Sequence, residues 1–116
     1  MTTKTLNNPE LETIRRRHEK DCFSMFTAAG SRKIRNYFMT LLRRLDKDCS
    51  RPAALRAFAS YFKSYARARY STGAHGEAGD TAVRESVWCA AMSLNPERRY
   101  EICDDTMDRL WDKHAG

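Results

Sequence analysis

The sequence predicts an all-α protein, a compact bundle of about five helices. Apolar residues recur every three or four positions, residues that cap helices precede these segments, and no alternating strand pattern persists. The length of 116 residues suits one domain, residues 1–116, and the 41% hydrophobic content is enough for a single core. Residues 1–8 are polar and are expected to form a flexible N-terminus.

The first predicted helix begins at Asn8-Pro9, a capping residue followed by proline at the first helical position. Glu10 and Glu12 then suit the positive end of the helix dipole. The apolar stripe of this helix consists of Leu11, Ile14, His18, Cys22, Met25 and Ala29. Gly30 is expected to end the helix.

The second and third helices each have an apolar face and an opposite polar face. The second, capped by Ser31, turns Ile34, Phe38, Leu41, Leu42 and Leu45 inward and Lys33, Asn36, Thr40, Arg44 and Lys47 outward. The third begins at Ser50-Arg51-Pro52, with Leu55, Phe58, Phe62 and Tyr65 inward, Tyr61 beside them, and Arg56, Ser60, Lys63, Arg67 and Tyr70 outward. These patterns predict two amphipathic helices that cover one core.

Residues 71–79 contain three glycines and are predicted to form a flexible loop, after which Asp80 caps the fourth helix. This helix, around residues 81–94, is apolar nearly all round, which predicts that it is central and most buried, with Trp88 inside. Asn95-Pro96 begins a fifth helix with acidic outer faces. Its inward stripe consists of Tyr100, Cys103, Met107, Leu110 and His114, with Trp111 alongside.

Charge is distributed unevenly along the chain, although the formal net charge is only +6. Residues 13–70 contain 15 Lys/Arg and 4 Asp/Glu, a local charge of +11, whereas residues 71–116 contain 5 and 9, a local charge of −4. Arginine supplies 15 of the 21 basic residues, and its planar guanidinium suits paired hydrogen bonds to carboxylate or phosphate. We read no signal peptide and no membrane span, so we expect a cytoplasmic protein without a membrane partner.

The basic surface of the second and third helices is the strongest candidate for a partner-binding site. Its residues are Lys33, Arg35, Arg44, Lys47, Arg56, Lys63, Arg67 and Tyr70. A solvated surface with internal ion pairs is the alternative, and it explains the first helix well, for example through Arg15 with Glu19. It explains the second and third helices poorly because acidic residues are few there. We therefore predict a partner with an acidic or phosphate-bearing surface.

Motifs for metal binding or base reading are incomplete. His18 and Cys22 stand four residues apart, a workable half of a zinc site, but no paired cysteine spacing completes it. We therefore expect core or boundary residues, four reduced thiols and no metal.

A helix-turn-helix around Gly30 is disfavoured because Phe26 and Asn36 stand where that motif requires a small and an apolar residue. A plain helical hairpin is predicted instead.

No catalytic pattern emerges, so we expect neither enzymatic activity nor a cofactor. In size, helical content, charge segregation and lack of a catalytic signature, the chain resembles the small accessory proteins of phages and plasmids, anti-CRISPR proteins among them. This resemblance is one of composition and covers no specific motif. The expected function is an interaction protein or inhibitor that docks on a larger protein or nucleoprotein through the basic surface. The alternative is a regulatory protein that binds nucleic acid directly with the same residues, and the oligomeric state is left open.

Overall fold

The computed structural model describes residues 6–21, 28–69, 77–94 and 104–116, and these residues form α-helices with no strand among them. The helices are α1 (Pro9–Asp21), α2 (Ala28–Lys47), α3 (Arg51–Ala68), α4 (Glu77–Leu94) and α5 (Asp104–His114). The predicted all-α bundle is therefore confirmed.

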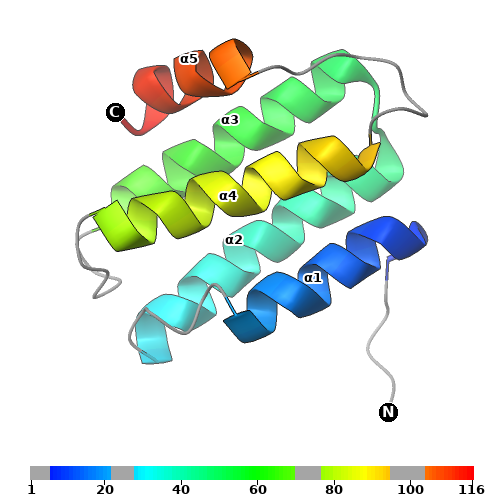
Figure 1. The fold of residues 1–116 in the computed structure, drawn as a ribbon, viewed down its shortest axis with the longest axis horizontal. Helices are drawn as coiled ribbons and strands as arrows, with labels where there is room; N and C mark the ends of the chain where they lie inside the picture. The colour runs from blue at the N-terminus through cyan, green and yellow to red at the C-terminus, as the bar shows by residue number, and fades with distance from the viewer. Residues whose placement is uncertain (1–5, 22–27, 70–76, 95–103) are drawn as a thin grey trace.

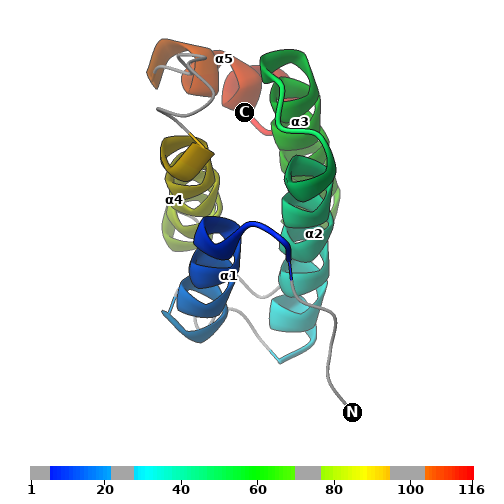
Figure 2. The same cartoon turned by 90° about the vertical axis from the view of Figure 1, so that its right-hand side faces the viewer.

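The helices are arranged in two layers. In one layer, α2 and α3 lie side by side and antiparallel, and α1 and α4 form the second layer in front of them (Figure 1). Figure 2 shows the two layers edge-on, with α5 along the edge nearest α3 and α4. The closest packing joins α3 to α2, α4 and α5, and joins α1 to α2 and α4. The helix with the most neighbours is therefore α3, and the central position predicted for the fourth helix is not confirmed.

A single hydrophobic cluster fills the space between the layers. The inward face predicted for the second helix is buried in full, from Ile34 to Leu45. Aromatic rings of α3 occupy the centre, where Phe62 meets the indole of Trp111 edge-on with 5.2 Å between ring centroids. Burial of each such side chain contributes about 1.5–3 kcal/mol to folding, so α3 ties both layers and α5 together.

The chain before α1 is attached to α2. The predicted cap at Asn8 is present, because its Oδ1 accepts hydrogen bonds from the backbone N–H groups of Glu10 at 2.8 Å and Leu11 at 3.4 Å. The backbone N–H groups of Asn7 and Asn8 donate to the Asp46 carboxylate of α2 at 2.8 and 2.9 Å. Residues 1–5 of the expected flexible N-terminus lie outside the described residues, whereas residues 6–8 are held by these bonds.

Two predicted helix boundaries are wrong. Gly30 does not end the first helix, since α2 already begins at Ala28 and Gly30 lies in its first turn. Alanine favours helix strongly and one glycine costs only about 1 kcal/mol, which a helix of 20 residues offsets. The fourth helix begins at Glu77 rather than after Asp80, so the expected loop, residues 71–79, overlaps α4 at its end. Residues 71–76 of that loop lie outside the described residues.

The burial predicted for Trp88 is also wrong. Its side chain is 41% exposed, and Met92 is 52% exposed. The buried face of α4 consists mainly of small residues and valines, namely Gly79, Ala82, Val83, Ser86, Val87, Ala90 and Ala91. Trp88 shares the opposite stripe with Arg84 and Glu85, because residues three and four apart lie on one face of a helix. The apolar run therefore belongs to a helix that buries one face and exposes Trp88 on the other, and other helices do not enclose it on all sides.

In α5, Met107 and Trp111 are buried, while Leu110 and His114 are half-buried. Trp111, which was predicted to lie beside the inward stripe, is therefore a core residue together with Met107, whereas Leu110 and His114 of that stripe are only partly buried. The predicted start at Asn95-Pro96, together with Tyr100 and Cys103, lies outside the described residues.

Candidate binding face on helices two and three

A groove of about 210 Å³ runs between α2 and α3. It is lined by Tyr37, Thr40, Leu41 and Arg44 of α2 and by Ala57, Ser60, Tyr61 and Ser64 of α3. Thr40 and Arg44 are exposed and lie on the side of α2 away from the buried Leu42. The groove therefore opens on the outer side of the layer, which none of the described helices covers (Figure 2).

Arg44 lines this groove, and it belongs to a set of six exposed cations on α2 and α3 that are together called the basic face: Lys33, Arg44, Lys47, Arg56, Lys63 and Arg67. At about 100° per residue, Lys33, Arg44 and Lys47 fall within about 60° of one another around α2. Arg56, Lys63 and Arg67 fall within about 40° around α3, opposite the buried Tyr65. Two rigid helices thus present six cations to one side.

Two further residues predicted for the partner-binding site, Arg35 and Tyr70, are not counted in the basic face. Arg35 is exposed, but it is nine residues from Arg44, which places it about 180° away around α2. Tyr70 lies outside the described residues. Arg43 is also exposed and adds a positive charge to α2 beside Arg44. The prediction did not include Arg43, although it directly precedes the predicted contact Arg44.

The basic face is nearly free of internal charge pairing. Within the described residues, none of Arg44, Lys47, Arg56, Lys63 and Arg67 forms an ion pair. Arg56 acts on the carboxylate of Asp48, whose pKa is lowered first by hydrogen bonds from Ser50 and to a smaller extent by the charge of Arg56. These cations consequently remain available to an external anion.

Helix α1 shows the contrasting arrangement, in which acids and bases neutralise one another. Nη2 of Arg15 lies 2.5 Å from Oε2 of Glu12, and Nε of Arg16 lies 3.3 Å from the same oxygen. The hydrogen bond from Arg15 is the largest of the influences that lower the pKa of Glu12 to about 2. Glu12 lies N-terminal to both arginines, and the side chain of Glu19, the predicted partner of Arg15, lies outside the description.

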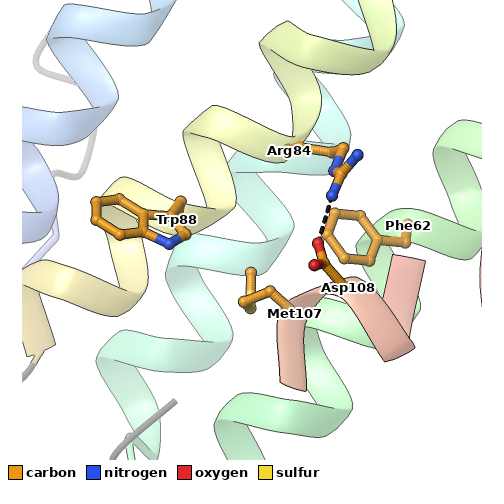
Figure 3. Close-up of a pocket in the computed structure, with 5 residues that line it drawn as sticks. All are labelled: Phe62, Arg84, Trp88, Met107 and Asp108. Carbon is orange, nitrogen blue, oxygen red and sulfur yellow. Dashed lines mark hydrogen bonds and ion pairs between the residues drawn. The ribbon is translucent and has the colours of Figure 1, made fainter. Parts of the chain in front are cut away.

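A second hollow, of about 270 Å³, lies between α3, α4 and α5 (Figure 3). Its walls are formed by Phe62, Arg84, Trp88, Met107 and Asp108. Nη2 of Arg84 lies 2.5 Å from Oδ1 of Asp108, and the same guanidinium stacks 5.3 Å from the centre of the Trp111 ring. Because each charge is compensated here, the hollow lacks the free charge that distinguishes the basic face.

His18 lies in the core, where its ring meets Phe38 edge-on with 5.7 Å between centroids. This confirms the core interpretation for His18, whereas Cys22 lies outside the described residues. Cys49 and Cys89 are half-buried free thiols, and burial raises the pKa of Cys89. Within the described ranges, no three His, Cys, Asp or Glu side chains are grouped so that they could hold a metal ion.

Comparisons with protein-family models, with curated proteins and with solved structures found no match to this chain. Among the helices that the structure describes, none combines the length and the apolar character needed to cross a lipid bilayer.

Proposed function

We propose that this protein is a small non-enzymatic interaction protein or inhibitor, which docks on a larger protein or nucleoprotein through the basic face. The observation that carries this proposal is the row of exposed cations Arg44, Lys47, Arg56, Lys63 and Arg67, which lack carboxylate partners within the described residues. Unpaired cations on one side attract an acidic or phosphate-bearing surface and orient it. Because they are fixed on two packed helices, less conformational freedom is lost on binding.

Direct binding of nucleic acid is the second candidate function. It is supported by the composition of residues 28–69, which contain 11 Lys/Arg and only 2 Asp/Glu. One of these two acids, Asp46, is engaged by the backbone of Asn7 and Asn8. A surface so poor in acids repels phosphate little.

The test compares two variants of equal charge. The basic-face variant carries Arg56→Glu, Lys63→Glu and Arg67→Glu, and the control variant carries Arg17→Glu, Arg109→Glu and Lys113→Glu at exposed positions of α1 and α5. Each tagged protein captures partners from a host lysate, with and without nuclease. We expect the basic-face variant to recover the main partner at least tenfold less than the control variant does. Equal recovery by both variants would contradict the proposal, and loss of capture only after nuclease treatment would favour the second candidate.

A further inference from the structure

The groove between α2 and α3 holds hydrogen-bond donors that the described chain does not use. The residues Tyr37, Ser60 and Ser64 are half-buried, and no described residue forms a hydrogen bond with their hydroxyl groups. Thr40 differs, because its hydroxyl donates to the carbonyl oxygen of Asn36 at 3.0 Å. Because these three hydroxyls line one groove and the described chain does not engage them, they are available to donate to an external acceptor.

The chemistry of the groove suits a phosphate group. No carboxylate lines it, and Arg44 contributes a guanidinium that has no ion pair within the described residues. Hydroxyl groups of serine and tyrosine, together with arginine, are the side chains that commonly contact phosphate oxygens in nucleic-acid complexes. A backbone phosphodiester adds two ester oxygens to its two charged non-bridging oxygens, so it can accept hydrogen bonds from several hydroxyls and a guanidinium.

The layout of the basic face suits a strand rather than an isolated anion. From Lys33 to Lys47 the axis of α2 advances about 21 Å, and from Arg67 to Arg56 the antiparallel α3 advances about 16 Å. Two rows of cations therefore follow the two sides of the groove. Tyr37 places an aromatic ring at the groove, where an unpaired base can stack. Neither helix projects from the layer as a reading helix for the major groove of a duplex does (Figure 2).

We propose that the groove between α2 and α3 binds the phosphate backbone of single-stranded nucleic acid. Tyr37, Ser60, Ser64 and Arg44 hold one phosphate, and the basic face contacts its neighbours along the strand. This inference rests on the proposed function, and it identifies the phosphate-bearing strand as the group that the basic face meets.

The experiment measures binding of a fluorescein-labelled 12-nucleotide oligothymidylate by fluorescence anisotropy at two salt concentrations. The groove variant is Ser60→Ala with Ser64→Ala, and its matched control is Thr13→Ala with Thr81→Ala, two exposed hydroxyls on α1 and α4. Because alanine favours helix, both variants are expected to keep the wild-type melting temperature. We expect the groove variant to bind about tenfold more weakly than the control, because two hydrogen bonds to the phosphate are removed.

Salt dependence separates the hydroxyl groups from the charges. Removal of the serine hydroxyls changes no counterion release, so the slope of log affinity against log salt should stay unchanged in the groove variant. In the basic-face variant the slope should flatten by about 0.7 for each phosphate that is no longer neutralised. This difference is the signature expected of a groove that holds a phosphate by both hydrogen bonds and charge.

Four results would overturn the inference. If the groove variant binds the oligonucleotide with wild-type affinity, the serine hydroxyls do not contact its phosphate. If only the basic-face variant loses binding, the proposed function stands. Tighter binding of a 12-base-pair duplex than of the single strand would assign the face to duplex nucleic acid. Binding of polyglutamate but not of the oligonucleotide, abolished in the basic-face variant, would assign it to an acidic protein and again leave the proposed function standing. Wild-type binding by the basic-face variant would contradict both.

Discussion

The Nε atom of Arg69 lies 3.2 Å from Oδ1 of Asp80, and this ion pair joins the end of α3 to the first turns of α4. The hydroxyl of Tyr65 donates to the same carboxylate oxygen at 2.7 Å. The guanidinium also lies 5.4 Å from the ring centre of Tyr65 and 5.5 Å from that of Trp111, and it donates to the carbonyl oxygen of Ala115. One arginine therefore links three helices.

We expect Arg69→Ala to lower the free energy of unfolding by about 2 kcal/mol, because it removes charge-assisted hydrogen bonds and two cation–π interactions together. The control is Arg67→Ala, an exposed arginine of the same helix, for which a change within about 0.5 kcal/mol is expected. Urea denaturation of both variants measures the difference. Equal stability would show that Arg69 does not join the helices.

The two tryptophans should differ sharply in their contribution to stability. Trp111 is buried against Phe62 and Tyr65, so Trp111→Ala should cost about 3 kcal/mol or more. Trp88 is 41% exposed, so Trp88→Ala should cost less than about 1.5 kcal/mol. Urea melts of the two variants test the exposed position of Trp88 on α4, and a larger loss for Trp88 would contradict it.

Acid should weaken the protein through Glu12. The pKa of Glu12 is lowered from 4.5 to about 2, first by the hydrogen bond from Arg15, so its ionised form stabilises the folded state. This contribution, about 2 kcal/mol, is complete above pH 4.5 and disappears as the pH falls toward 2. The difference in unfolding free energy between wild type and Glu12→Gln should therefore shrink between pH 6 and pH 2.5. A difference that does not vary with pH would rule out this role of Glu12.

The sequence was sufficient to predict α2 and α3, the two helices that form one layer. In α2 and α3, large apolar and charged residues separate onto opposite faces, so the inward set containing Phe38 and Phe58 could be assigned from spacing alone. The α1 to α2 boundary could not be assigned that way. Gly30 carries a local stop signal, but the stability of a helix depends on all its residues and on what it packs against.

The candidate site was predicted in part. Spacing along each helix brought together Arg56, Lys63 and Arg67, whereas Arg35, which the prediction also included, lies about 180° from Arg44 around α2. The groove could not be foreseen, because it depends on the register in which Tyr37 of α2 meets Ser64 of α3. Nothing within either helix specifies that register; it is set by packing of both helices on the common core.

The charge of the basic face, and not the net charge of the protein, is expected to bind a polyanion. The salt concentration that elutes the protein from a heparin column tests this claim directly. The basic-face variant and the control variant both lower the formal net charge from +6 to 0, because each of three reversals changes it by −2. Circular dichroism should show unchanged helix content in both, since exposed charges contribute little to stability. We predict that the basic-face variant elutes at much lower salt than the control variant, which should remain close to wild type. Elution of the two variants at the same salt concentration would contradict the account.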